Sequence, residues 1–480
     1  MRTGSSGRPD LPSDHVTPYD RFAWNDTEVE RLLATGEHQR ELIAYFGVQE
    51  HTELARLAHK AASTSNTSDT RVLVVPGIMG SQLGMRRPAP LPHDVLWVDP
   101  IDIELGRLSS LRLPGTAPVI SLGVVLYSYL RVKLHLRAAG FSAAFFDYDW
   151  RLGVDELGRA LAERVLADPA SSVMIVAHSM GGLVSRAALA LPGMEKVKRV
   201  VLMGTPNFGS FAPVQALRGT YAVVRKIARL VRNSSAETMA AEVFTTFPSL
   251  YHMLPCAGRN GGPDLFDPGE WPEVDPRPNT TLLATTKSVR DSLAPPDERF
   301  TTIVGVGHET VTAVARRNDE FEYMITRRGD GTVPSVSAEL PGALTHYARA
   351  AHSDLTRDPV VAAAVVDLLR KGKTRRLPTR WTSRSRAEAF VRDSQLRLTH
   401  AEKVDWAGME PEERRVFLQN LNEPPQLKLR VPAASRAAAR RAAEGRRASG
   451  PARSRGKAAG RVPRGGSSRR VVRRGKSRRK

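Results

Sequence analysis

The segment at 172–186, SVMIVAHSMGGLVSR, constrains the fold more than any other part of the sequence. Its apolar first half has the length and continuity of a buried β-strand, and a helical pattern follows at once. Small residues, Ala177 and Gly181, lie on either side of Ser179 between the two. A sharp strand–turn–helix of this kind lifts the serine hydroxyl above the edge of a sheet, at a helix N-terminus. Taken alone, the pattern also fits a serine that merely caps a helix.

Short apolar runs and helical patterns alternate along most of the chain. The predicted strands lie at 72–75, 144–146, 173–177, 200–203, 302–306 and 344–347, and the predicted helices at 126–139, 155–167, 181–191 and 358–371. Non-alternating apolar runs separated by helices indicate a mainly parallel sheet that is covered on both faces. We therefore predict a doubly wound α/β domain over 71–372.

Other segments break this rhythm. Residues 209–300 contain Pro- and Gly-rich loops, and we predict that they form a cap or lid over the C-terminal edge of the sheet. Residues 1–20 are predicted to be disordered, and 21–64 to form N-terminal helices. For 374–430 we predict two or three peripheral helices, including 386–406 and 411–421.

The formal net charge of +21 is concentrated at the C-terminus. Residues 431–480 contain 18 Lys and Arg and one acidic residue, Glu444, whereas the other 430 residues carry 53 basic and 49 acidic side chains. This tail has few large apolar residues and cannot bury enough surface to fold, so we predict that it is disordered. It could bind anionic lipid, acidic protein or nucleic acid through counterion release, or be solvated with no dedicated partner.

The composition excludes several other classes of protein. Hydrophobic residues make up 41% of the chain, which rules out disorder throughout. The single cysteine, Cys256, rules out an intramolecular disulfide and a Cys-rich zinc site. The N-terminus has no apolar signal segment, and no apolar run is long enough to span a membrane. We expect a reducing compartment, and neither a metal nor a cofactor.

A serine nucleophile needs a base, which in turn needs an acid to orient it. After a serine on a strand–turn–helix, these partners follow in the order Asp or Glu, then His. Asp330 in the sequence GDGTVP is the candidate acid, although an Asp-Gly turn is also common for purely structural reasons. His352 in AHSDL is the candidate base. The competing residues are Asp354 for the acid, and His346 and His308 for the base.

An acyl-transfer site also needs two N–H donors for the oxyanion. Met180 follows Ser179 and is the first candidate. The second lies in VVPGIMGSQL at 74–83, where a predicted strand ends in Pro and Gly residues. We assign it to Ile78, with Met79 as the adjacent alternative. A plain turn at the end of the strand fits this segment equally well when it is taken alone.

Seven segments together resemble the lecithin:cholesterol acyltransferase family, which includes lysosomal phospholipase A2. They are VVPGIMGSQL (74–83), LWVDP (96–100), FFDYDWR (145–151), AHSMGGLVSR (177–186), LMGTPNFGS (202–210), GDGTVP (329–334) and AHSDL (351–355). The resemblance implies an α/β-hydrolase fold, with Ser179, Asp330 and His352 as the triad and with Ile78 and Met180 as oxyanion donors. It implies acyl transfer from a lipid ester to water or an alcohol.

Further expectations follow from this resemblance. A wall of apolar residues in the cap would form an acyl pocket; the candidates are Phe211, Phe244, Phe247, Leu250 and Leu254. Asp149 and Arg151 are expected to form a structural ion pair near the rim of the site, and Trp97 to pack rather than bind substrate. Unlike the animal members, this chain has no second cysteine and no signal segment.

We expect a bacterial cytoplasmic protein, with the tail able to hold it at the periphery of an anionic membrane. The alternative is a polyanion-binding protein, acting through nucleic acid or anionic membrane, in which the hydrolase fold is only a scaffold. A degraded scaffold would be expected to lose one of the catalytic residues, and none is missing here. The oligomeric state cannot be predicted from the sequence.

Overall fold

The computed structural model describes residues 16–421 apart from 18–19, 21–24, 66–68, 116–117, 232–233, 257–261, 384, 386, 400–402 and 407. The chain divides into two units, 1–430 and 431–480. All the described residues belong to the first unit. The predictions of disorder for residues 1–20 and for the basic tail therefore fall outside the described residues, except at residues 16, 17 and 20.

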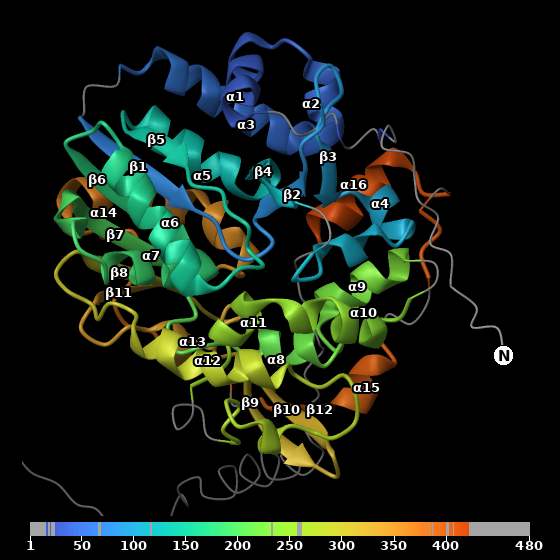
Figure 1. Cartoon of the computed structure of the whole chain (residues 1–480). Helices are drawn as coiled ribbons and strands as arrows, with labels where there is room; N and C mark the ends of the chain where they lie inside the picture. Colours follow the sequence, from blue (N-terminus) through green and yellow to red (C-terminus); the bar gives the residue numbers. More distant parts are fainter. Residues whose placement is uncertain are drawn as a thin grey trace, which may run out of the picture. The chain divides into compact units, whose positions relative to one another are not determined.

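A six-stranded parallel sheet forms the centre of the described unit (Figure 1). In spatial order its strands are β11 (Leu344–Ala348), β8 (Phe300–Gly305), β7 (Val197–Met203), β6 (Ser172–His178), β1 (Thr70–Val75) and β5 (Ser142–Phe145). Each predicted apolar run coincides with one of these strands, to within three residues at either end. The prediction of a mainly parallel sheet is confirmed.

Helices cover both faces of this sheet. On one face, α5 (Leu126–Ala138) and α14 (Pro359–Lys371) share a core with the strands. On the other face lie α6 (Val154–Ala167) and α7 (Met180–Leu189). The N-terminal helices α1 (Asp26–Thr35), α2 (Gln39–Phe46) and α3 (Val48–Ser63) pack against the outer side of α5 (Figure 1). The doubly wound α/β class predicted from the alternating pattern is confirmed.

The segment between β7 and β8 is helical. It contains α8 (Ala212–Leu217), α9 (Ala222–Leu230), α10 (Ala236–Glu242), α11 (Pro248–His252) and α12 (Thr280–Asp291), with short 3₁₀ helices at Phe244–Thr246 and Pro268–Glu270. The segment that these helices form between β7 and β8 contains no strand, and it corresponds to the residues 209–300 predicted as a cap. Figure 1 shows these helices in green and yellow, grouped below the strands of the central sheet.

Two small antiparallel sheets were not predicted. One joins β2 (Ser81–Met85), β3 (Asp94–Trp97) and β4 (Ile120–Val124). Between β3 and β4 the chain forms α4 (Pro100–Glu104) and a 3₁₀ helix at Arg107–Leu111. The other joins β9 (Thr310–Arg317), β10 (Glu320–Thr326) and β12 (Ala389–Arg392). Their strands are four to eight residues long.

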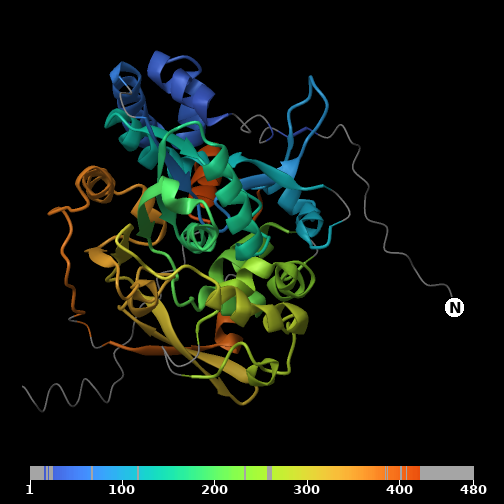
Figure 2. The ribbon, with the colours of Figure 1, turned by 60° about the vertical axis from the view of Figure 1, so that its left-hand side comes forward.

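The predicted helix at 386–406 is wrong. Strand β12 pairs antiparallel with β10 there, and only the short α15 (Asp393–Arg397) is helical. Pairing with a distant strand overrides the local helical pattern. In Figure 2 the orange segment after α14 runs down the left-hand side of the view towards β12. The predicted helix at 411–421 is present as α16 (Pro411–Gln419).

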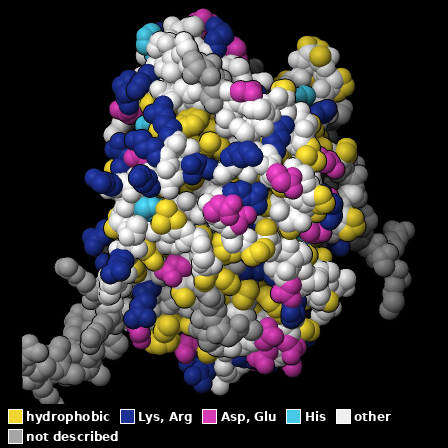
Figure 3. Space-filling model, turned by 90° about the vertical axis from the view of Figure 1, so that its left-hand side faces the viewer, with side chains coloured by type: hydrophobic (Ala, Val, Ile, Leu, Met, Phe, Trp, Pro, Cys, Tyr) yellow, Lys and Arg dark blue, Asp and Glu magenta, His cyan; other side chains and the backbone are white. Residues whose placement is uncertain are grey.

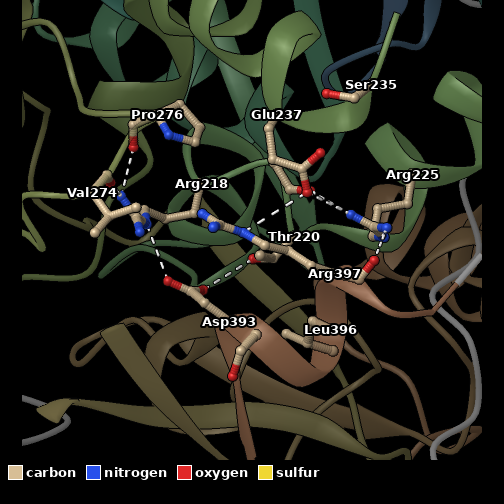
Figure 4. A network of polar contacts seen from close by, with 12 residues as sticks. Arg218, Thr220, Arg225, Ser235, Glu237, Val274, Pro276, Asp393, Leu396 and Arg397 are labelled. Atoms are coloured by element: carbon tan, nitrogen blue, oxygen red, sulfur yellow. Dashed lines mark hydrogen bonds and ion pairs between the residues drawn. The ribbon is translucent and has the colours of Figure 1, made fainter. Parts of the chain in front are cut away.

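A buried ion pair holds this C-terminal segment to the cap (Figure 4). Arg218 Nε lies 3.1 Å from Asp393 Oδ2, and the two side chains are 1% and 2% exposed. The hydroxyl of Tyr323 also donates to Asp393 at 2.8 Å. Arg225 donates from Nε to the carbonyl of Thr399 at 2.7 Å. The segment after α14 is therefore an integrated part of the described unit rather than a peripheral addition.

Asp99 at the N-terminus of α4 makes the stability of this region depend on pH. Burial raises its pKa from 3.8 to about 7, against the opposing effect of hydrogen bonds from Thr17 and from the N–H groups of Ile101 and Asp102. The folded protein thus keeps the proton up to about pH 7, whereas the unfolded chain releases it near pH 4. This contribution to stability is present below about pH 4 and is lost as the pH rises to about 7.

Asp99→Asn imitates the neutral carboxyl, so we expect its stability relative to wild type to improve by roughly 4 kcal/mol between pH 4 and pH 8. Urea denaturation of both proteins at the two pH values measures this difference. A difference that stays constant with pH would contradict the assignment.

None of the helices in the described part of the chain is long and apolar enough to cross a membrane.

Candidate active site

Ser179 occupies a strained turn between the central strand β6 and helix α7. Its φ of 54° and ψ of −127° lie in a region that residues with a side chain rarely adopt. The turn is held by the Ser179 N–H, which donates to the Met203 carbonyl at 2.9 Å. A Cβ atom at Gly181 would lie only 2.3 Å from the Pro76 carbonyl oxygen, so this position cannot carry a side chain without displacing the end of β1. The resulting geometry is that of an exposed nucleophile turn.

His352 and Asp330 complete a hydrogen-bonded relay with this serine. His352 Nε2 lies 2.9 Å from Ser179 Oγ, and its Nδ1 lies 2.8 Å from Asp330 Oδ2. Asp330 lies in the loop between β10 and α13 (Ser335–Ala338), and His352 lies between β11 and the 3₁₀ helix Ser353–Thr356. The structure therefore brings together the three residues that the sequence suggested, from segments up to 173 positions apart.

The surroundings of Asp330 fix the proton positions in this relay. Its side chain is 1% exposed, and Oδ1 accepts hydrogen bonds from the N–H groups of Thr332 and Val333 at 2.9 and 2.7 Å. Because a carboxylate only accepts, the His352 proton sits on Nδ1, and Nε2 is left to accept from the Ser179 hydroxyl. This is the tautomer that a general base next to a serine requires.

The competing candidates lie elsewhere. His346 is buried in β11, with Nδ1 3.2 Å from the Leu377 carbonyl. His308 donates its backbone N–H to the Gly329 carbonyl. Among the described hydrogen bonds of the His352 ring, none involves Asp354. The geometry therefore favours His352 and Asp330 over all three.

The loop that follows β1 lies against Ser179, as an oxyanion loop would have to. Three aromatic side chains hold its carbonyl groups: Tyr148 donates to Pro76 at 2.5 Å, Trp97 to Met79 at 3.0 Å and Trp150 to Ser81 at 3.0 Å. Ile78 lines the same cavity as Ser179, and Met180 begins α7 directly after it. The assignment of oxyanion donors to Ile78 and Met180 stays a prediction.

In the sequence, the three aromatic residues that donate to this region were marked only as parts of family motifs. Trp97 packs edge-on against Trp150, with ring centroids 5.5 Å apart, in agreement with the predicted packing role. It also anchors the Met79 carbonyl, which was not foreseen. Arg151 and Asp149 form the expected ion pair at 2.6 Å, and Arg151 also donates to the Leu111 carbonyl.

A cavity opens over Ser179, with an empty volume of about 1050 Å³ that includes space open to solvent. Its wall on the cap side is apolar and comprises Ala212, Pro213, Ala216, Val223, Leu250 and Met253. Polar side chains of Ser128, Ser353, Thr356, Arg357 and Gln419 also line it. Apolar cap residues and polar residues from other segments therefore share the cavity that contains the serine.

The predicted wall of this cavity is largely wrong. Of the five proposed side chains only Leu250 lines it, whereas Phe211, Phe244, Phe247 and Leu254 are buried in the main core. Phe247 packs against Trp150 with ring centroids 5.7 Å apart. The sequence identifies these residues as apolar, but not which side of the cap helices faces the site.

In the described part of the chain, no group of three or more His, Cys, Asp and Glu residues could hold a metal ion. The site is built from a serine, a histidine, a carboxylate and backbone N–H groups.

Comparison with known proteins finds a match at the level of the domain. The model of a hydrolase-type family described as PGAP1, PGAP1-like alpha/beta domain, matches residues 163–314, about a third of the chain. That stretch includes β6, the Ser179 turn, the cap and β8. The search of curated proteins gave no match. The finer resemblance to the lecithin:cholesterol acyltransferase family stays a prediction.

Solved structures with a similar fold include lipases and esterases. The mature lipase BlEst2 from Bacillus licheniformis is 14% identical over 64% of this chain and 94% of that chain, with a TM-score of 0.35. A chain of the Tle4–Tli4 complex is 14% identical over 64% of this chain and 100% of that chain, with a TM-score of 0.38. The metagenomic carboxyl esterase MGS0156 is 12% identical over 60% of this chain and 66% of that chain, with a TM-score of 0.29. Such scores are too low to assign a function, which has to come from the site itself.

Proposed function

We propose that this protein is a serine-dependent acyl-ester hydrolase or O-acyltransferase that acts on lipid-like esters through a Ser179 acyl-enzyme. The observation that carries the proposal is the relay of Ser179, His352 and Asp330 at the floor of a cavity with one apolar wall. An apolar wall suits an acyl chain, because burying each CH₂ group contributes about 0.8 kcal/mol.

The chemistry follows from the proton positions. Ser179 Oγ attacks the ester carbonyl carbon while His352 Nε2 takes the hydroxyl proton, and Asp330 stabilises the resulting imidazolium. The oxyanion accepts hydrogen bonds from the N–H groups assigned to Ile78 and Met180. When the tetrahedral intermediate collapses, the C–O bond to the alcohol breaks and His352 returns the proton to the leaving oxygen. Water or an alcohol then attacks the acyl-enzyme by the same steps in reverse.

We infer that the acceptor approaches the acyl-enzyme along the polar residues of the cavity. Ser128, Ser353, Thr356 and Gln419 provide hydrogen-bonding groups in its lining. Access of water along these residues decides between hydrolysis and transfer. Acyl transfer is the part of the proposal that rests on the resemblance to the lecithin:cholesterol acyltransferase family.

The test is an assay of purified protein with esters that differ only in acyl chain length, with and without an added long-chain alcohol. We expect free fatty acid without the alcohol, and a new ester in its presence if transfer competes. The His352→Asn variant, with the ring removed, is expected to form neither product. A folded wild-type protein that releases no acid and forms no ester, with or without liposomes, would contradict the proposal.

We further propose that residues 431–480 hold the enzyme at an anionic membrane, as a peripheral protein of a bacterial cytoplasm. The tail has 18 basic residues and one acidic residue, whereas the body is nearly neutral. Figure 3 shows basic and acidic side chains interspersed on one face of the described unit. Each basic residue close to an anionic surface contributes ~1 kcal/mol.

Deleting 431–480 is therefore expected to abolish sedimentation with phosphatidylserine vesicles at low salt, while hydrolysis of a water-soluble ester is retained. High salt should release the full-length protein. Equal sedimentation of the two proteins would contradict a role of the tail at membranes. If the tail instead serves nucleic acid, its deletion will remove salt-sensitive binding to DNA and leave vesicle binding unchanged.

A further inference from the structure

His178 precedes the nucleophile directly and has no part in the mechanism above, although it is buried beside the base. Its ring centroid lies 4.7 Å from that of His352. Its Nε2 lies 2.9 Å from the His352 carbonyl oxygen, and its Nδ1 lies 2.9 Å from the hydroxyl of Tyr129 in α5. The Tyr129 hydroxyl also accepts a hydrogen bond from the Gly77 N–H at 2.8 Å. These contacts join four segments that are distant in the sequence.

Each hydrogen bond in this series of groups can have only one donor and one acceptor assignment. The His352 carbonyl accepts, so the proton of His178 is on Nε2. Burial, and then the neighbouring His352, lower the pKa of His178 to about 3, so its ring is neutral and Nδ1 is an acceptor. Tyr129 therefore donates to Nδ1, and burial raises the pKa of its hydroxyl, which keeps that proton in place. Each group in the chain has its partner.

The two ends of this hydrogen-bonded chain contact the oxyanion loop beside the nucleophile and the backbone of the base. At one end, Gly77 packs so closely against the nucleophile that a Cβ atom there would lie 2.7 Å from Ser179 Cβ. Gly77 is also the residue before Ile78, the assigned oxyanion donor. At the other end, the His352 backbone is fixed twice, because its N–H donates to the Asp330 carbonyl at 2.9 Å. A neutral His178 also avoids a second positive charge beside the imidazolium that forms on His352.

We propose that His178 and Tyr129 are positioning residues, which tie the oxyanion loop and the base to one hydrogen-bonded chain around Ser179. This inference rests on the proposed acyl-transfer function. The chain sets the distances between nucleophile, base and oxyanion donors, and His178 and Tyr129 also line the cavity over Ser179. A displacement of reacting groups by about 1 Å can cost ~100-fold in rate.

Three variants test this role on a short, water-soluble ester. Tyr129→Phe keeps the ring and leaves Gly77 and His178 without their partner, so we expect kcat to fall by roughly 10–100-fold with little change in KM. His178→Leu should do the same. His178→Gln, whose amide offers an acceptor and a donor in place of Nδ1 and Nε2, should restore most of kcat.

Tyr251→Phe is the matched control. Tyr251 is equally buried, donates from its hydroxyl to the Thr245 carbonyl at 2.7 Å and accepts from the Asn279 N–H at 2.8 Å, but it lies outside the chain. Its loss should lower the melting temperature and leave kcat unchanged. Equal kcat for His178→Gln and His178→Leu, or an unchanged kcat for Tyr129→Phe, would overturn the proposal.

A readout that needs no activity separates this inference from the proposed function. In protein labelled with ¹⁵N-histidine, we expect the His178 ring to remain the neutral Nε2–H tautomer from pH 5 to pH 9, also in Ser179→Ala. A charged ring or an Nδ1–H tautomer would overturn the chain even if esters are hydrolysed. The expected tautomer in a protein that hydrolyses no ester would contradict only the proposed function, and the chain would stand as a structural feature.

Discussion

Ser179→Ala is expected to reduce kcat for ester hydrolysis on the order of 10⁶-fold, to the level left by binding and the oxyanion donors alone. The reason is that Ser179 Oγ is the atom that forms the acyl-enzyme, and no other hydroxyl lies 2.9 Å from His352 Nε2 among the described residues. Alanine keeps the Cβ atom, so the strain at φ 54° is unchanged and we expect no loss of stability. Initial rates with a chromogenic ester, together with thermal denaturation, measure both effects.

The matched control is Ser185→Ala in the same helix. Ser185 is fully buried and donates to the Gly181 carbonyl at 2.7 Å, but it does not line the cavity. We expect its activity to stay close to wild type. If both serine variants retained wild-type rates, a Ser179 acyl-enzyme could not be the route of hydrolysis.

Asp330→Asn is expected to lower kcat ~10⁴-fold while the protein stays folded. The amide keeps the size of the carboxyl group and can still accept from Thr332 and Val333 N–H. Directed at His352 through its NH₂ group, however, it donates rather than accepts, so the ring turns to the tautomer with its proton on Nε2. That tautomer cannot take the Ser179 proton.

Asp354→Asn provides the comparison, because Asp354 lies two residues after His352 and was the competing acid in the sequence. We expect its kcat to be within about twofold of wild type, since the substitution changes a side chain that makes no hydrogen bond to the His352 ring, and such substitutions have small effects. The opposite ranking of the two variants would assign the acid to Asp354 and would refute the relay described here.

The nucleophile could be predicted from the sequence because its geometry is local. A buried strand, a serine between small residues and an immediate helix are contained in 172–186, and the sharp turn at Ser179 follows from them. Asp330 and His352 required one additional rule, the order of these residues along an α/β chain. His352 comes close to Ser179 because β11 and β6 are parallel strands of one sheet and end at the same edge, whereas Asp330 follows β10 of the separate antiparallel sheet.

The remaining features depend on contacts that no local pattern encodes. The cap helices place small residues such as Ala212 and Ala216 at the cavity and bury Phe211 and Phe247, which reverses the predicted wall. Strand β12 forms because β10 offers it an edge, 70 residues away in the case of Glu322 and Arg392. The chain from Gly77 through Tyr129 and His178 to His352 likewise exists only when α5 and the sheet are packed.

The most direct test of the central claim is labelling with a fluorophosphonate probe, which reacts only with an activated serine. Wild type, Ser179→Ala and Ser185→Ala would be labelled, digested and mapped by mass spectrometry. The account predicts one modified site, Ser179, in wild type and in Ser185→Ala, and none in Ser179→Ala. Folded wild-type protein that remains unlabelled with and without liposomes, or that is labelled at another residue, would contradict it.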